Sequence, residues 1–132
     1  MALSGTITVT SREKFEFIDI TSALQREVSR LGGEASLLVV YNPHTTAGLT
    51  INEGADPAVQ SDIIGVLRQI VPDDYPFRHL EGNSPSHVMA SLMGSSVTVL
   101  LDGNRLQLGT WQRIFFCEFD GPRSRTVSWK IV

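Results

Sequence analysis

Alternation of polar and apolar residues marks both ends of this chain and limits the folds that it can adopt. Residues 6–10 are Thr-Ile-Thr-Val-Thr, and residues 15–20 alternate in the same way after a polar turn. A period of two residues is typical of a β-strand with one buried face. Residues 35–41 form an apolar run that predicts a buried strand, and residues 49–52 predict another. Strands therefore dominate the first part of the predicted core.

The C-terminal part repeats this pattern. Residues 97–100 and 105–108 flank Asp-Gly-Asn at 102–104, which is a signal for a hairpin turn. Residues 114–119 and 126–131 predict two more strands. We therefore expect the sheet to be antiparallel.

Three segments show helical spacing or helix-boundary signals. They cover residues 21–30, 57–70 and 84–93, and a glycine pair at 32–33 would end the first. The other two open with Asp-Pro and Ser-Pro, where proline suits the first helical turn. The sequence predicts an α+β fold built on antiparallel sheet, with two or three helices, in a single domain over residues 1–132.

Charge and hydropathy exclude two broad classes of partner. The chain of 132 residues has a net charge of -3, whereas a surface that binds nucleic acid is basic. Its apolar runs fall far short of the roughly 20 residues that a membrane-spanning helix needs. We therefore expect neither nucleic acid nor a membrane as a partner.

The cysteine content and the first residues bear on the cell compartment. Cys117 is the only cysteine, so no internal disulfide can form, and its apolar neighbours predict a buried, inert side chain. Residues 1–4 lead at once into strand-like alternation, without the pattern of a signal peptide. A cytoplasmic location is the expectation.

The three histidines lie among small, hydroxylated and turn-forming residues. His44 is in Asn-Pro-His-Thr-Thr-Ala-Gly, directly after an apolar run, and His79 and His87 flank a short polar stretch. Imidazole both titrates near neutral pH and binds metals. Three imidazoles with an open fourth position would suit catalytic zinc, although the chain lacks the His-Glu-x-x-His motif. These positions indicate a site rather than scattered surface residues.

In His79-x3-Asn83-x3-His87, His87 lies in the first turn of a helix if Pro85 is the first helical residue. Backbone N–H groups point outward there, and the helix dipole favours an anion. This helix end predicts a phosphate or carboxylate cradle, whereas His87 could instead ligate a metal. The simpler alternative is a capped helix with two surface histidines.

Other polar residues follow predicted strands. Asn52 and Glu53 end the strand after His44, where they could bind substrate and act as acid or base, or merely make turn hydrogen bonds. Arg123 follows a turn and could present its planar guanidinium to an anion, or be a solvated hairpin residue. Trp111 is more typical of a core or an interface than of a stacking platform. Nearby carboxylates that could serve as a base or orient a metal ligand are Asp56, Glu81 and Asp120.

Six segments together resemble one protein family. In chain order they are residues 42–47, 51–57, 79–87, 90–96, 108–112 and 119–123. In order and spacing they are similar to the YjbQ family over essentially the whole chain. The resemblance implies an antiparallel β-sandwich with helices that assembles as a homotrimer.

The resemblance also implies a site near the subunit boundary that holds a metal or an anion. In this chain it would be lined by His44, Asn52, Glu53, His79, Asn83 and His87. Some members are described as secondary thiamine-phosphate synthases, which join a hydroxymethylpyrimidine diphosphate to a thiazole phosphate and release pyrophosphate. We therefore expect a small phosphorylated metabolite as the ligand. A divalent metal is the expected cofactor, and three histidines fit zinc better than Mg²⁺.

Roles follow from this expectation. The catalytic residues would be His44, Glu53 and His87; the substrate-binding residues Asn52, Asn83, Ser84 and Arg123; the metal ligands His44, His79 and His87. Two other functions stay open, a zinc-type metal-dependent hydrolase and a non-catalytic protein that binds a metabolite or supports an assembly.

Overall fold

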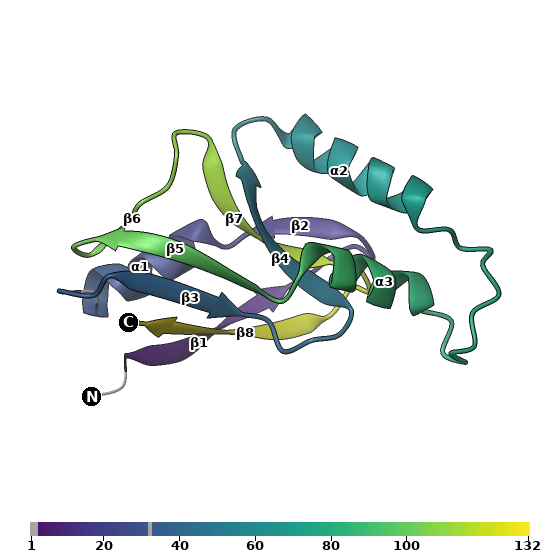
Figure 1. Cartoon of the computed structure of the whole chain (residues 1–132), viewed down its shortest axis with the longest axis horizontal. Coiled ribbons are helices and arrows are strands. Elements are labelled where there is room, and N and C mark those ends of the chain that lie inside the picture. The colour runs from purple at the N-terminus through teal and green to yellow at the C-terminus, as the bar shows by residue number, and fades with distance from the viewer. Residues whose placement is uncertain (1–2, 32) are drawn as a thin grey trace.

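Two antiparallel sheets and three helices form the structure (Figure 1). The computed structural model describes residues 3–31 and 33–132. The strands are β1 (Ser4–Thr10), β2 (Glu16–Asp19), β3 (Leu37–Tyr41), β4 (Ala47–Glu53), β5 (Ser96–Asp102), β6 (Arg105–Leu106), β7 (Gln112–Glu118) and β8 (Ser124–Ile131). The helices are α1 (Thr21–Leu31), α2 (Pro57–Ile70) and α3 (Ser84–Met93). The predicted α+β class and antiparallel pairing are confirmed.

The larger sheet has the strand order β1-β8-β3-β5-β6. Ile7 lies opposite Val127, and Val40 lies opposite Trp129, so β8 is bonded on both sides. Alternate residues of β8 point into the core, as the alternation in the sequence predicts.

The smaller sheet has the order β2-β7-β4, and its central strand is covered on both faces. Ile114 and Phe116 pack toward the larger sheet, whereas Phe115 and Cys117 pack with Met89 beneath α2 and α3. Burial on both faces explains why β7 is a continuous apolar run rather than an alternating one. Cys117 is buried as predicted, and this burial raises the pKa of its thiol.

Helix boundaries follow the predicted signals. Asp56 caps α2, because its carboxylate accepts a hydrogen bond from the N–H of Ala58 at 2.9 Å. Of the glycine pair after α1, Gly32 lies outside the described residues, and Gly33 has a φ of 51°. None of the helices in the described parts of the chain combines the length and the apolar character that a membrane span requires.

The C-terminal end of α3 lies against the start of β4. The N–H of Leu49 donates to the carbonyl of Gly94 at 3.1 Å. Gly48 permits this approach, since a Cβ there would be 2.8 Å from the Cβ of Met93. This close packing fixes α3, and with it His87, relative to the turn before β4.

Trp111, predicted to lie in a core or an interface, lies outside the core of this chain. Its side chain is 62% exposed, at the turn that precedes β7. Its backbone carbonyl accepts a hydrogen bond from the N–H of Gly54 at 2.9 Å. Because Trp111 lies just before the strand, the sheet does not direct its side chain inward.

Candidate functional site

Two turns and the N-terminal end of α3 surround a polar hollow of ≈ 340 Å³. One turn follows β3 and the other follows β7, so the hollow joins segments that are far apart in the sequence. Its charged and hydrogen-bonding side chains include His44, Asn83, His87, Asp120, Arg123 and Arg125. Four residues of the predicted site, from three segments, thus meet in one place.

A second hollow of ≈ 400 Å³ lies beside the first. His44 and His87 line both, and the second hollow extends to Tyr41 and Ser95. These two histidines therefore occupy the boundary between two spaces that a ligand could fill.

The turn that carries His44 is held by a buried asparagine. Asn42 is 1% exposed; its Nδ2 donates to the carbonyl of Ala47 at 2.7 Å, and its Oδ1 accepts from the N–H of His44 at 3.0 Å. An Asx side chain that bonds to backbone two residues ahead stabilises a turn. The backbone at His44 is thereby ordered before any ligand binds.

The ring of His44 contacts the backbone of β8. Its Nε2 lies 2.9 Å from the carbonyl oxygen of Thr126 and 3.2 Å from the Thr126 nitrogen. With Nε2 engaged, Nδ1 is the ring nitrogen that His44 can offer to a ligand.

His79 contacts His87 and lies close to an acidic side chain. Its ring meets that of His87 edge-on, with the centroids 5.3 Å apart, and its Nε2 is 3.8 Å from Glu81 Oε2. The side chain is 44% exposed and lines neither hollow that His44 and His87 share. His79 therefore contacts His87 without lining either hollow.

Asn83 precedes α3, yet its side chain does not cap the helix. Its Nδ2 donates to Asp120 Oδ2 at 3.0 Å, which identifies Oδ1 as the acceptor; that oxygen is buried and has no partner among the described residues. An unpaired buried acceptor costs free energy unless a water or ligand donates to it.

The start of α3 offers fewer free N–H groups than the sequence suggested. Pro85 has none, and the N–H groups of Ser86 and His87 both point to the carbonyl of Asn83, at 3.0 and 3.4 Å. Ser84 lines neither hollow. Side chains rather than helix N–H groups therefore supply most of the hydrogen-bonding capacity here.

Arg123 folds back onto the turn that carries it. Its Nε donates to the carbonyl of Asp120 at 2.9 Å, and its Nη2 contacts Asp120 Oδ2 at 3.2 Å. Its side chain is 49% exposed. Because the guanidinium side of this pair is half exposed, the pair contributes little stability, and an entering anion can compete with Asp120 for the guanidinium.

Beneath this turn lies a buried ion pair. Arg125 is 5% exposed and Glu118 is 0% exposed. The guanidinium donates to both carboxylate oxygens of Glu118, and its Nη2 also donates to Thr46 Oγ1 at 2.9 Å. Ser11 Oγ and the N–H of Asp120 donate to Glu118 as well, at 2.8 and 3.1 Å. The network links β7, β8 and the His44 turn.

Glu118 is ionised in this environment. Burial by itself raises the pKa of its carboxyl, but the hydrogen bonds from Arg125, Asp120 and Ser11 and the charge of Arg125 outweigh it. The net effect holds the pKa of Glu118 below its usual value. Arg125 therefore contacts the ionised carboxylate of Glu118 and also lines the hollow.

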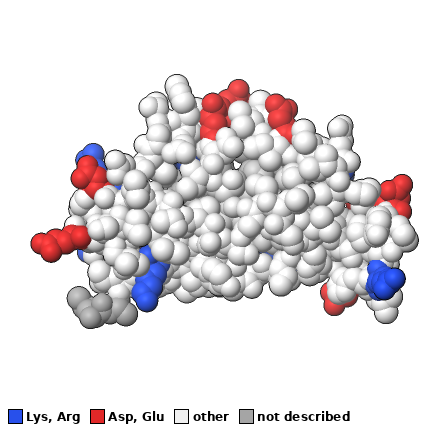
Figure 2. All heavy atoms as spheres, in the orientation of Figure 1, with Lys and Arg blue, Asp and Glu red and all other residues white. Residues whose placement is uncertain are grey.

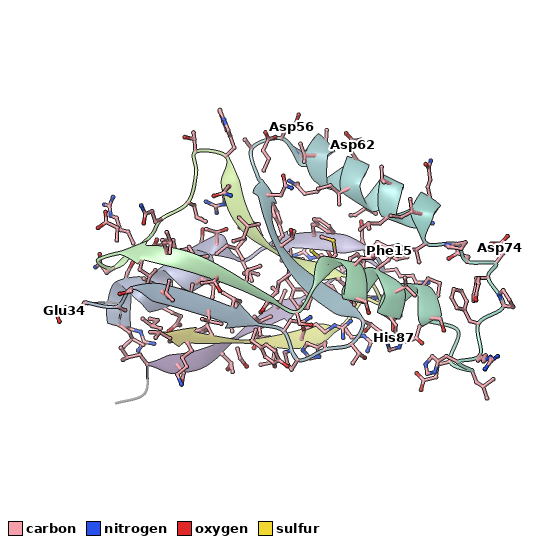
Figure 3. The ribbon with its side chains drawn as sticks, in the orientation of Figure 1. Phe15, Glu34, Asp56, Asp62, Asp74 and His87 are labelled. Atoms are coloured by element: carbon pink, nitrogen blue, oxygen red, sulfur yellow. The ribbon has the colours of Figure 1, made fainter. Side chains whose placement is uncertain are left out.

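Asn52 and Glu53 lie at the far end of β4 from His44. The strand spans seven residues, or roughly 20 Å, and Figure 3 shows Asp56, just beyond it, well separated from His87. Asn52 Oδ1 accepts from the N–H of Glu53 at 2.7 Å, the turn-type bond that was the alternative for this residue. A single chain does not bring these two residues to the histidines.

The donor set bears on the predicted metal. Over residues 3–31 and 33–132, no three His, Cys, Asp or Glu side chains are close enough to hold a metal ion. His44 also has its Nε2 on the Thr126 backbone. The residues of one chain do not fit a preformed three-histidine metal centre, and a metal would need ligands from elsewhere.

Sequence reasoning missed Thr46, Glu118 and Arg125. Two signals could have found the pair. Glu118 interrupts an apolar run, and a buried charge requires a partner. Arg125 shares the parity of Val127 and the other inward residues of β8, so the alternation directs its side chain into the protein.

The family comparison agrees with the resemblance in the sequence. The family model described as "UPF0047 protein YjbQ-like" matches residues 5–132. A UPF0047 protein of Methanocaldococcus jannaschii is 45% identical, over 94% of this chain and 90% of that protein. The UPF0047 protein YugU of Bacillus subtilis is 43% identical, over 92% of each chain.

Solved structures share the fold. A YjbQ/UPF0047-family protein from Clostridium acetobutylicum is 46% identical, with a TM-score of 0.92 over 96% of this chain and 98% of that one. A protein of unknown function from Sulfolobus solfataricus is 26% identical, with a TM-score of 0.93 over 99% and 96% of the two chains. This chain belongs to the YjbQ-like UPF0047 family.

Proposed function

We propose that this protein binds a small phosphorylated metabolite in the ≈ 340 Å³ hollow and catalyses a group transfer on it. The observation that carries the proposal is the meeting of two histidines, two arginines and an unsatisfied asparagine in one polar hollow. Arginine suits phosphate oxygens, and histidine suits proton transfer near neutral pH.

The reaction to test first is the one that the family resemblance implies, formation of thiamine phosphate. The thiazole nitrogen donates its electron pair to the pyrimidine methylene carbon, while the bond from that carbon to the diphosphate oxygen breaks. Pyrophosphate leaves with the electron pair of that bond. His87 would donate a proton to it, His44 Nδ1 would orient it, and Arg123, released from Asp120, would neutralise its charge.

The second part of the proposal is that a homotrimer completes the site. Asn52 and Glu53 lie at the other end of β4 from the histidines of their own chain, so a neighbouring protomer would supply them. A head-to-tail ring brings different surfaces of two copies together, as this requires. Asn52 would then bind substrate and Glu53 would serve as acid or base.

A nearly uncharged face supports this assembly. Figure 2 shows charged side chains at the edges of the face that carries β3, β5 and α3, with few near its centre. Strand β3 and helix α3 contain no Asp, Glu, Lys or Arg, while Leu100 and Leu92 are both 57% exposed. Exposed apolar area of this kind is typical of an interface. The face borders the second hollow, of ≈ 400 Å³, at Tyr41 and Ser95.

The decisive assay supplies a hydroxymethylpyrimidine diphosphate and a thiazole phosphate to the purified assembly and measures thiamine phosphate and pyrophosphate. We expect turnover that His87→Ala abolishes and that Gln69→Ala, on the exposed side of α2, leaves unchanged. If neither the original protein nor Gln69→Ala forms product, and the original protein does not complement a thiamine auxotroph, this reaction is rejected. Binding of phosphorylated metabolites without turnover would identify a non-catalytic binding protein.

Metal content is a separate measurement. Elemental analysis of the assembled protein tests zinc, the metal that a hydrolase with three histidine ligands would require. Near-stoichiometric zinc that is lost in His79→Ala would favour that hydrolase over the transferase.

A further inference from the structure

The hollow contains an arginine that is almost fully buried yet not fully bonded. Arg125 uses Nε and Nη2 on Glu118 and Thr46, whereas no described residue accepts a hydrogen bond from its Nη1. The buried side-chain atoms that lack a partner in the described chain are Asn83 Oδ1 and Trp129 Nε1, so Nη1 is not enclosed. Arg125 lines the hollow, and the two N–H groups of Nη1 are donors without a partner among the described residues.

Asn83, which lines the same hollow, carries a buried acceptor. Asn83 Oδ1 has no partner, and it cannot exchange places with Nδ2, since Nδ2 donates to the carboxylate of Asp120. A chain of hydrogen bonds runs from Asn83 through Asp120 and Glu118 to Arg125. The donors and the acceptor are therefore held on one connected network.

We infer that Arg125 and Asn83 form a subsite for a protonated phosphate group. Arg125 Nη1 donates to an anionic phosphoryl oxygen, and Asn83 Oδ1 accepts from the P–OH of the same group. The inference rests on the proposed function, because this group would belong to the phosphorylated metabolite. From the sequence, this role was assigned to neither residue: Arg125 was not singled out, and Asn83 was predicted to bind substrate without a stated acceptor role.

The charges around the hollow agree with a protonated ligand. Asp120 and Glu81 line it together with Arg123 and Arg125, and Glu118 neutralises Arg125 from behind. A fully ionised phosphate would be repelled by the two lining carboxylates, whereas a phosphate that keeps one proton carries less charge and satisfies Asn83.

A comparison of inorganic phosphate with sulfate tests the contact with Arg125 and the contact with Asn83 separately. At neutral pH phosphate retains at least one P–OH, whereas sulfate is similar in size and has no proton to donate. Calorimetric titration of the full-length protein at matched ionic strength should show phosphate binding about tenfold or more tightly than sulfate. Asn83→Ala should reduce phosphate affinity to that of sulfate, and Asn104→Ala, in the exposed β5–β6 turn, should not.

Arg125→Lys keeps a cation beside Glu118 but removes the guanidinium fork. This variant should bind both phosphate and sulfate about tenfold more weakly. Arg105→Lys, which changes an exposed arginine in β6, should leave the affinity for both ions unchanged. Equal affinities of the original protein for the two ions, or no saturable binding of phosphate, would overturn the inference. So would unchanged binding in a folded Arg125→Lys variant; if that variant does not fold, the Asn83→Ala comparison decides.

These outcomes are independent of the proposed reaction. Phosphate discrimination with no thiamine phosphate formed would support the subsite and reject the reaction. Turnover that Arg125→Lys and Asn83→Ala leave unchanged would support the reaction and reject the subsite.

Discussion

His44 and Thr126 are joined where the pairing of β3 with β8 ends. The last paired residues are Tyr41 and Ser128, and the same register would set Thr126 opposite Pro43, which has no N–H to donate. The imidazole Nε2 of His44 instead lies 2.9 Å from the Thr126 carbonyl oxygen. A side chain thus takes over a bond that proline removes from the ladder, and this places His44 at the hollow.

Replacing this histidine tests both its structural and its chemical role. His44→Ala removes the contact with Thr126 and should lower the free energy of unfolding by about 1 kcal/mol, while turnover is lost. His79→Ala is the control, because that ring is 44% exposed and lines neither hollow; its stability should change by less than about 0.5 kcal/mol. Urea denaturation measures both. Equal losses of stability in the two variants would contradict a stabilising role for the contact between His44 and Thr126.

The Glu118–Arg125 pair should respond strongly to loss of one partner. Glu118→Gln leaves a buried guanidinium without its counter-charge and should cost about 3–5 kcal/mol. Glu27→Gln breaks the exposed pair with Arg30 instead, where Arg30 is 67% exposed, and should cost under about 1 kcal/mol. Comparable denaturation midpoints for the two variants would show that the buried pair is not a major stabilising contact.

The same pair predicts a pH dependence. The pKa of Glu118 is lower in the folded protein than its ordinary value of 4.5, so folding stabilises the ionised carboxylate. That contribution is fully present above the ordinary pKa and is lost as the pH falls through the lower, folded pKa. The stability difference between the original protein and Glu118→Gln should therefore shrink in acid. Unfolding free energies from about pH 7 to about pH 3 check this, and a constant difference would contradict it.

Gly48 offers a test of how α3 is held. A Cβ at this position would lie 2.8 Å from the Cβ of Met93 and 3.0 Å from the carbonyl oxygen of Gly94. Gly48→Ala should cost about 1–3 kcal/mol and should move His87. Gly65→Ala, in α2, has open space and should raise stability by up to about 1 kcal/mol. Thermal melts measure the stability of both variants, and phosphate titration tests whether His87 has moved. Unchanged stability in Gly48→Ala would show that α3 can shift to make room for the added Cβ.

The proposed trimer has a complementation test. His87→Ala and Glu53→Ala should each abolish turnover, but co-expressed chains should regain it. In a head-to-tail ring, random mixing leaves about one quarter of the sites with both residues intact. Mixtures that stay inactive, although mass analysis shows mixed trimers, would place Glu53 outside the site.

The face used for assembly can be tested separately. Leu100→Glu puts a charge on the outer side of β5 and should yield monomers by light scattering. Val66→Glu changes a similarly exposed apolar residue on α2, with 56% exposure against 57% for Leu100, and should remain assembled. Dissociation by Val66→Glu alone would locate the interface on α2 instead.

The strands and helices were determined by the sequence alone. Each predicted element lies within two residues of its observed bounds, because periodicity, prolines and glycines are local signals. Cys117 was also placed correctly, since a run of apolar neighbours predicts burial. Trp111 lies outside the core, because it is at a turn where no periodicity applies, and its alternative place in an interface stays a prediction.

The grouping of the site residues was decided only by the tertiary structure. The sequence predicted both Glu53 and His87 to lie in one site with His44. The length of β4 separates Glu53 from His44, whereas the packing of α3 on β4 places His87 beside His44. The same packing joins Arg125, Glu118 and Asn83, which are far apart in sequence, into one network. Local periodicity determines how each segment is shaped, but long-range contacts determine which side chains meet.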